Sequence, residues 1–262
     1  MSTVASSGAT ISYDVHGAAD APALLFINSI GTARALWDRQ RRVFESSHRV
    51  IQYDARGHGQ SSVPPGPYTI AQLAQDAVAI LDAERIASAD VCGISLGGIT
   101  ALWLGVHAPE RVRSLVLANT GARIGTIESW TARITLVYDG GMKAVADVAI
   151  PMWFTEEYRQ REAATVQQFR AMVESCPVEG YLGCAAALRD EDLRDAVASV
   201  RCAVLSIAGA SDRATAPELL HFVQKQLPRS RLVTLPCAHL SNVEQAAAFN
   251  AALSTFLAAQ AA

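Results

Sequence analysis

The chain of 262 residues is long enough for one large domain, or for a core with an inserted subdomain, with a substantial buried interior. Half of its residues are hydrophobic and its net charge is only -3, with Lys and Arg scattered, so it lacks the basic surface of a nucleic-acid-binding protein. No apolar run is long enough to cross a bilayer, and residues 1–10 do not resemble a secretory signal, so we expect a soluble, cytoplasmic protein without membrane partners.

The five cysteines are widely spaced and lie mostly within apolar runs. Their number is odd, and none forms a Cys-x-x-Cys pair of the kind used for redox chemistry or metal binding. We therefore predict reduced core thiols and no metal site. The positions are Cys92, Cys176, Cys184, Cys202 and Cys237.

The first half of the chain alternates predicted strands with predicted helices. Residues 10–15 alternate apolar and polar side chains and end at the turn His16-Gly17, which is typical of a hairpin at a sheet edge. The later apolar runs are continuous, as in strands covered on both faces. This alternation predicts a mostly parallel sheet with right-handed crossovers and helices on both faces. We expect these strands over residues 23–27, 49–53 and 114–118 and just before residue 95, and helices over residues 34–44, 69–83 and 98–107.

From residue 123 to about residue 200 the alternation stops, and the segment has the pattern of consecutive helices. An all-helical insertion between two sheet strands is most simply a cap over the carboxyl edge of the sheet. We therefore predict a helical cap over residues 123–195 and a core formed by residues 1–122 and 196–262. The predicted cap-region helices cover residues 128–138, 142–149, 156–174, 180–188 and 193–200, with breaks at Gly140-Gly141, Pro151 and Pro177. Beyond it we expect strands over residues 203–208 and 231–235, and helices over residues 217–226 and 243–259.

The stretch Gly93-Ile94-Ser95-Leu96-Gly97 joins a predicted strand to a predicted helix and has the form of a nucleophile elbow. A serine hydroxyl is a poor nucleophile at neutral pH, so it must be exposed on a tight turn and paired with a base. Gly93 and Gly97 supply the missing side chains, and Gly98 lets the helix pack closely against its neighbours. The alternative is a glycine-rich turn with an incidental serine. The choice between this turn and a nucleophile elbow depends on whether the rest of the chain supplies a base and an acid.

Ser95 needs a base, and His239 is the best placed of the six histidines because it follows the last predicted strand. Asp212 follows the preceding strand and would orient the imidazole. The order serine, acid, histidine is the one expected for a nucleophile elbow of this kind. The alternatives are a solvated loop histidine and an aspartate that only caps a turn. Other histidines lie at positions 16, 48, 107 and 221, and Asp190, Asp192 and Asp195 compete with Asp212 only if the helical segment is not a cap.

Two backbone N–H groups are candidates for stabilising a tetrahedral oxyanion. One belongs to Leu96, directly after the nucleophile, and the other to Ile30, in the loop after the strand over residues 23–27. Asn28-Ser29 stands in this loop where a His-Gly pair is often found. The assignment of Leu96 is therefore the more secure of the two.

Longer motifs make the chain resemble the α/β-hydrolases and, among them, the 3-oxoadipate enol-lactonase family. Core motifs are shared with many hydrolases, whereas the cap motifs are more discriminating, and together they cover nearly the whole sequence. The core motifs are residues 28–32 with Trp37, residues 53–59, 93–98 and 108–113; the cap motifs are residues 119–126, 179–181 and 184–190, followed by the loop of residues 238–245. Ile30 stands where leucine is expected.

The resemblance implies an α/β-hydrolase fold, with a mostly parallel eight-stranded sheet and an inserted helical cap. It implies that Ser95, Asp212 and His239 form a catalytic triad, with no metal or organic cofactor. The expected reaction is hydrolysis of the lactone ring of 3-oxoadipate enol-lactone to 3-oxoadipate, a step of aromatic-compound catabolism by the β-ketoadipate pathway.

Such a substrate is a small lactone that carries a carboxylate, so the pocket should contain a cation or several donors. Trp130 and Arg133 lie three residues apart on a predicted cap helix and would share a face. We expect Arg133 to bind the carboxylate, because a guanidinium forms two parallel hydrogen bonds with it. The alternative is a surface arginine beside a packing tryptophan. Trp153 is a further candidate for substrate binding, and Arg123 and Arg189 remain possible.

Two other classes of function remain open. One is another carboxylesterase, a lactonase or a cofactor-free haloperoxidase on the same core. The second is a ligand receptor without catalytic activity, which has no need for a complete triad. A haloalkane dehalogenase is disfavoured because it requires a carboxylate where this chain has Ser95. The oligomeric state is left open.

Overall fold

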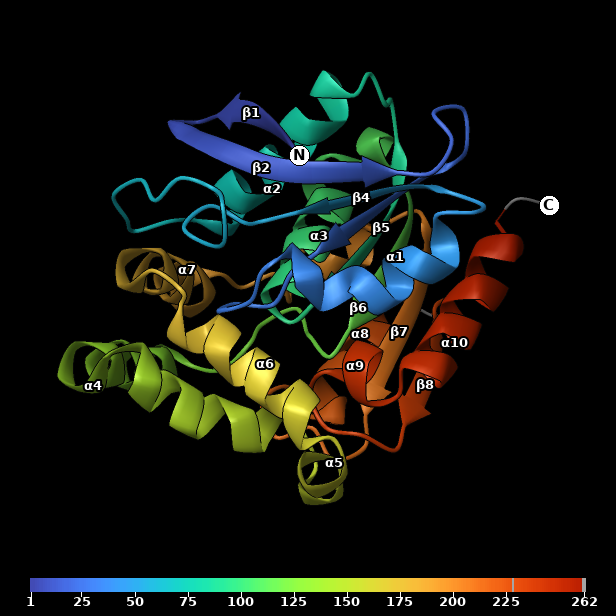
Figure 1. Cartoon of the computed structure of the whole chain (residues 1–262). Coiled ribbons are helices and arrows are strands. Elements are labelled where there is room, and N and C mark those ends of the chain that lie inside the picture. Colours follow the sequence, from blue (N-terminus) through green and yellow to red (C-terminus); the bar gives the residue numbers. More distant parts are fainter. Residues whose placement is uncertain (228, 261–262) are drawn as a thin grey trace.

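The computed structural model describes residues 1–227 and 229–260 and is organised around one eight-stranded sheet (Figure 1). The strand order is β1-β2-β4-β3-β5-β6-β7-β8. From β4 onward neighbouring strands are parallel, whereas β1 and β2 are antiparallel to their neighbours. The prediction of a mostly parallel sheet is confirmed. The strands are β1 (Ser2–Ser6), β2 (Ala9–His16), β3 (Ala23–Ile27), β4 (Arg49–Tyr53), β5 (Ala89–Ile94), β6 (Val112–Ala118), β7 (Ala203–Gly209) and β8 (Arg231–Leu235).

Helices cover both faces of the sheet. On one face α2 packs against α3, which contacts β3, β5 and β6; on the other α1 packs against α10, which contacts β7 and β8 (Figure 1). Every residue of β3 and β5 is therefore buried, which explains their continuous apolar runs. The core helices are α1 (Asp38–Phe44), α2 (Ile70–Ala83), α3 (Leu96–His107), α8 (Pro217–Gln226), α9 (Ser241–Glu244) and α10 (Ala246–Ala258), and short 3-10 turns are η1 (Arg34–Trp37) and η2 (Pro109–Arg111).

The N-terminal edge differs from the prediction. The hairpin is formed by β1 and β2 around Ser7 and Gly8, both with positive φ, and not by a turn at His16-Gly17. After Gly17 the chain crosses to β3, which lies beyond β4 in the sheet. The alternating pattern of β2 was recognised correctly, but the polar segment before it also forms a strand because its pairing with β2 stabilises it.

Four helices fill the segment between β6 and β7, and they lie together beyond one end of the strands (Figure 1). They are α4 (Ile127–Trp153), α5 (Glu156–Arg161), α6 (Ala163–Glu174) and α7 (Val178–Asp190), and α4 packs against both α6 and α7. The break expected at Gly140-Gly141 is a kink within α4, where Gly141 has φ 62°. That residues 123–195 form a separate cap domain stays a prediction.

Four of the helix predictions were wrong. Pro151 does not end α4, because it lies two residues before the last residue of the helix and removes only one hydrogen bond of the final turn. The helix expected over residues 156–174 is divided at Glu162, and the one expected over residues 243–259 is divided at Gln245. Residues 193–200 contain only a short 3-10 turn, η3 (Val197–Ser199). After the Val197 N–H donates to the Leu193 carbonyl, the Ser199 and Val200 N–H groups donate three residues back, to the Ala196 and Val197 carbonyls, so the segment tightens into a 3-10 turn.

The five cysteines are free thiols, and four of them are buried. Within the residues described, no helix combines the length and the apolar character needed to span a membrane. Over the same ranges, no group of three or more His, Cys, Asp and Glu side chains is arranged to hold a metal ion.

Candidate active site

Ser95 lies at a sharp turn between the end of β5 and the start of α3. Its backbone has φ 57° and ψ −119°, a conformation that non-glycine residues rarely adopt. The turn is held from both sides, because the Ser95 N–H donates to the Ala118 carbonyl at 3.1 Å and the Thr120 hydroxyl donates to the Ser95 carbonyl at 2.8 Å. The neighbouring strand end therefore stabilises the strained residue.

Each of the three glycines around Ser95 lies too close to a neighbouring group to carry a Cβ. A Cβ on Gly93 would lie 2.0 Å from the Gly97 carbonyl oxygen, and a Cβ on Gly97 would lie 2.1 Å from the Ile27 carbonyl oxygen. A Cβ on Gly98 would lie 2.5 Å from the Thr120 side chain. These distances are far below van der Waals contact, so the turn can exist only with glycine at each of these positions.

Asp212 and His239 meet although 26 residues separate them in the chain, because they follow the neighbouring parallel strands β7 and β8. The His239 Nδ1 lies 2.9 Å from Asp212 Oδ2, and both side chains are almost completely buried. An ionised carboxylate can only accept, so Nδ1 carries the proton and donates. The Nε2 lone pair is thereby left available to accept a proton.

The Asp212 carboxylate is surrounded by donors in addition to His239. Its Oδ1 accepts from the N–H groups of Ala214 at 2.8 Å and Thr215 at 2.9 Å, and its Oδ2 accepts from the Thr215 hydroxyl at 2.7 Å and from Asn119 Nδ2 at 2.9 Å. Burial by itself raises the pKa of Asp212, but the charge of His239 and these hydrogen bonds outweigh it and lower the pKa to about 2. The carboxylate is therefore ionised at neutral pH.

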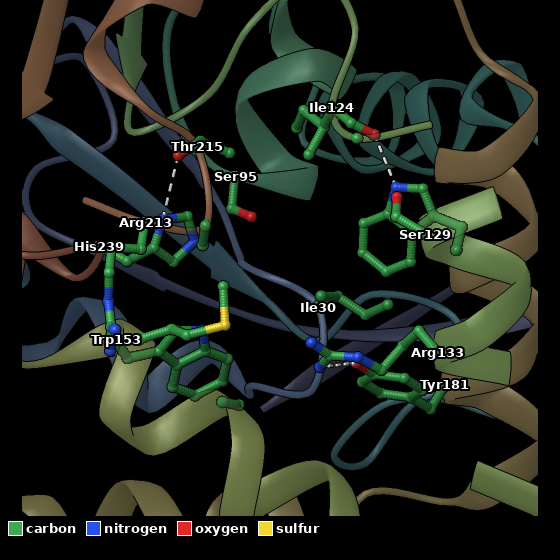
Figure 2. A pocket seen from close by; sticks show the side chains of 15 residues that line it. Ile30, Ser95, Ile124, Ser129, Arg133, Trp153, Tyr181, Arg213, Thr215 and His239 are labelled. Atoms are coloured by element: carbon green, nitrogen blue, oxygen red, sulfur yellow. Dashed lines mark hydrogen bonds between the residues drawn. The ribbon is translucent and has the colours of Figure 1, made fainter. Parts of the chain in front are cut away.

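Ser95 and His239 line the same cavity, whose volume is about 290 Å³. Figure 2 shows Ser95, Thr215 and His239 on one side of this cavity, with Ser129, Arg133 and Tyr181 on the other. In the described part of the chain no hydrogen bond joins the Ser95 hydroxyl to His239. Such contacts are often long without substrate and tighten when it binds. The arrangement thus places an alcohol, a base and an acid at one rim of the sheet.

The backbone N–H groups of Ile30 and Leu96 are both available for a ligand. Leu96 is the first residue of α3, so its N–H has no partner within the helix. Ile30 lies in the loop after β3 and lines the cavity. Among the described residues neither N–H donates a hydrogen bond. An oxyanion is stabilised by backbone N–H groups that are fixed in place and have no other hydrogen-bond partner.

Helix α4 lines the cavity with Trp130, Arg133 and Trp153. Arg133 lies on the wall opposite Ser95, whereas Trp153, at the end of the helix, lies on the side of His239 (Figure 2). The Trp130 Nε1 donates to the Ile124 carbonyl at 2.6 Å, which orients the indole. Arg133 donates to the Tyr181 hydroxyl at 3.4 Å, a long contact that leaves most of its donors free for a ligand (Figure 2). The structure therefore brings all three predicted substrate-binding residues to one cavity.

The other candidate residues lie elsewhere. Arg123 forms an ion pair with Asp192 at 2.9 Å, and Arg189 pairs with Asp190 at 2.7 Å; none of the four lines the cavity. The rival histidines at positions 16, 48, 107 and 221, and Asp195, do not line it either.

Arg213 lines the cavity but was not predicted. Its guanidinium donates to the Pro151 carbonyl at 2.9 Å, so it connects the Asp212 loop with the end of α4. In the sequence, only its position next to Asp212 could have indicated that Arg213 lies near the candidate site. Tyr181, which lines the cavity from α7, was quoted as part of a motif but given no role.

Comparisons with known proteins agree with this architecture. A family model described as alpha/beta hydrolase fold matches residues 22–168. The chain is 39% identical over 255 residues to the 3-oxoadipate enol-lactonase 2 of Acinetobacter baylyi, covering 97% of this chain and 96% of that protein. The crystal structure of the enol-lactonase from Burkholderia xenovorans superimposes with a TM-score of 0.96 at 35% identity, covering 98% of this chain and 100% of that one. A hydrolase from Pseudomonas aeruginosa gives a TM-score of 0.95 at 44% identity, with 98% and 97% covered.

Proposed function

Because the chain belongs to the α/β-hydrolase family, we propose that it hydrolyses the lactone ring of 3-oxoadipate enol-lactone to give 3-oxoadipate. One observation carries the proposal: the cavity has Ser95 and His239 on one wall and Arg133 on the other, in a chain similar over nearly its full length to a named enol-lactonase. The geometry suits a small ester that also carries a negative charge. The reaction would be a step in the catabolism of aromatic compounds.

In the first half of the reaction Ser95 Oγ attacks the lactone carbonyl carbon while His239 Nε2 takes the hydroxyl proton. Asp212 stabilises the imidazolium that forms, because it is ionised and bonded to Nδ1. The oxyanion of the tetrahedral intermediate accepts hydrogen bonds from the N–H groups of Leu96 and Ile30. One such donor is typically worth about 10²- to 10³-fold in rate.

Collapse of the intermediate breaks the ring C–O bond and leaves an acyl group on Ser95. The leaving oxygen departs as an enolate, which is a better leaving group than an alkoxide, and it takes up the proton held by His239. Ketonisation of the enol makes ring opening hard to reverse. His239 then removes a proton from water, which attacks the acyl carbon. As this second tetrahedral intermediate collapses, His239 returns the proton to Ser95 Oγ and the second carboxylate of 3-oxoadipate is released.

Recognition of the substrate carboxylate is assigned to Arg133, and Trp130 and Trp153 line the rest of the substrate's path across the cavity. A guanidinium with most of its donors unused offers two parallel hydrogen bonds to a carboxylate. The helices of residues 123–195 would act as a cap that closes the cavity over the core of residues 1–122 and 196–262. The chemistry draws on no metal or organic cofactor and needs no nucleic acid or membrane, and we place it in the cytoplasm.

The test follows the loss of enol-lactone absorbance with wild-type protein and with Ser95→Ala. We expect turnover by the wild type and a loss of about 10⁴- to 10⁶-fold in kcat for the variant. Ser206→Ala is a matched control, because the buried Ser206 hydroxyl has no hydrogen-bond partner within the described chain and lies outside the cavity. A panel of p-nitrophenyl esters and simple lactones is measured in parallel. Slow opening of the enol-lactone beside fast turnover of simple esters would contradict the proposed substrate and favour a general carboxylesterase.

A further inference from the structure

We propose that His58 is a positioning residue that holds the Ile30 N–H in place to stabilise the oxyanion. His58 lies in the loop after β4, in a motif to which the triad mechanism assigns no role, and the cavity does not include it. The inference rests on the proposed function, because it concerns the oxyanion site of the same reaction. Its basis is a contact between two loops that follow neighbouring strands.

The imidazole of His58 bridges these loops. Its Nε2 accepts from the Gly31 N–H at 2.9 Å, and its Nδ1 lies 3.1 Å from the Arg56 carbonyl oxygen. A carbonyl can only accept and a backbone N–H can only donate, so both contacts are satisfied by one form of the ring alone. That form is the neutral tautomer with its proton on Nδ1.

Burial favours the same form. The His58 side chain is only 1% exposed, and this burial lowers the pKa of the imidazole. The Asp54 carboxylate and the Arg56 carbonyl act in the opposite direction but less strongly. A protonated ring would direct an Nε2–H at the Gly31 N–H, which would separate the two loops.

The contact is placed at the middle of the loop that carries Ile30. The ends of this loop are attached elsewhere: Asn28 Nδ2 donates to the Tyr53 carbonyl at 2.7 Å, and the Arg34 N–H donates to Asp54 Oδ1 at 2.7 Å. Between these anchors Gly31 adopts φ +74°. The Gly31 N–H is part of the peptide group that joins Ile30 to Gly31. Its bond to His58 therefore limits backbone rotation at Ile30, the residue whose own N–H would bind the oxyanion.

The turn that presents His58 depends on the glycines beside it. Gly57 and Gly59 both have positive φ, at 75° and 52°. A Cβ on Gly59 would lie 2.3 Å from the Asp54 carboxyl carbon, and a Cβ on Gly57 would lie 2.4 Å from the Gly180 Cα. The motif therefore folds back tightly enough to bring the imidazole under the Ile30 loop.

The experiment compares His58→Leu, which has no acceptor, with His58→Gln, whose side-chain oxygen can accept from the Gly31 N–H. Both are measured for kcat and KM on p-nitrophenyl acetate, beside His221→Leu, an exposed histidine on α8, as the matched control. We expect His58→Leu to lower kcat about 10²-fold with KM changed less than threefold, because the oxyanion forms only in the transition state. His58→Gln should recover at least tenfold of that loss, and His221→Leu should behave as wild type.

Equal kcat values for His58→Leu and wild type would overturn the inference, as would equal values for the Leu and Gln variants or a loss that falls on KM. Urea unfolding of each variant identifies one that has failed to fold. The ¹⁵N spectrum of wild-type histidines gives a test that needs no variant: His58 must show a protonated Nδ1 and an unprotonated Nε2 at pH 7. Any other protonation state excludes the bridge. Absence of enol-lactone turnover by the wild type would refute the proposed substrate but would leave these ratios and this spectrum unaffected.

Discussion

The two walls of the cavity are built very differently. On the triad wall, which carries the proposed triad of Ser95, Asp212 and His239, the Asp212 carboxylate accepts five hydrogen bonds, all at 2.7 to 2.9 Å. On the cap wall (Trp130 and Arg133) the Arg133 guanidinium makes one hydrogen bond within the described part of the chain, a long one of 3.4 Å to the Tyr181 hydroxyl. Bond making requires groups already in place, whereas recognition of a carboxylate tolerates adjustment of a long side chain.

The difference follows from how each wall is attached to the sheet. The triad residues follow β5, β7 and β8, whose ends are aligned by the hydrogen bonds of the sheet. The end of α4 is tied to the triad loops, because the Leu240 N–H donates to the Trp153 carbonyl at 3.1 Å. The half of α4 that carries Arg133 lies beyond the kink at Gly141 and is free of this constraint.

After the loss expected for Ser95→Ala, the next largest effect comes from the acid of the triad wall. Asp212→Asn should lower kcat by about 10³- to 10⁴-fold, because an amide neither stabilises the imidazolium nor selects the correct tautomer. Steady-state kinetics on the enol-lactone measure it. Asp190→Asn is the control, since that residue pairs with Arg189 outside the cavity and should keep wild-type activity. Comparable losses in the two variants would show that Asp212 is not the triad acid.

A smaller effect is expected on the cap wall. Arg133→Ala should lower kcat/KM for the enol-lactone about 10²-fold, chiefly through KM, because a charge-assisted pair of hydrogen bonds is lost. Arg213→Ala should cost less than tenfold, because Arg213 is exposed and already donates to Pro151. Neither variant should change turnover of p-nitrophenyl acetate, which has no carboxylate. The reverse order of the two losses would assign the carboxylate to Arg213.

Lowering the pH should reduce the free energy of unfolding, because Asp212 on the triad wall becomes protonated. The pKa of this group is about 2 in the folded state, against an ordinary value of 3.8. Its contribution to stability is therefore complete above about pH 4 and is lost as the pH falls toward 2, which amounts to about 2 kcal/mol. Urea unfolding of the wild type between pH 5 and 2 should show this loss in excess of that in Asp212→Asn. Parallel pH profiles for the two proteins would contradict it.

The smallest effect concerns the orientation of the cap wall. Trp130→Phe removes the hydrogen bond to the Ile124 carbonyl, which is worth about 1 kcal/mol. We expect kcat/KM for the enol-lactone to fall by roughly fivefold, with kcat little changed. Stopped-flow or steady-state kinetics at low substrate concentration measure the change. A loss confined to kcat would mean that Trp130 acts on the triad rather than on recognition.

Local patterns were sufficient to propose the main residues of the candidate site. The glycines around Ser95 mark a turn that only they can form, and strand periodicity placed Asp212 and His239 at strand ends. The hairpin of β1 and β2 is local, but it was missed because residues 2–6 are short and mostly exposed and carry little apolar pattern. The position of β4 between β2 and β3, by contrast, cannot be read from any local pattern. The helix expected over residues 193–200 is reduced to a 3-10 turn, in which the Ser199 and Val200 N–H groups donate three residues back.

The sequence by itself therefore determined the fold class, the nucleophile turn and the candidates for base and acid, because each depends on residues that are neighbours in the chain. Only the tertiary structure decided which arginines face the cavity, since Arg123 and Arg133 have the same chemistry and differ only in where their helices and loops are packed. It also decided the contact between His58 and Gly31, 27 residues apart. Such contacts depend on the register of β3 and β4, and the free energy that sets this register comes from burial across the whole sheet.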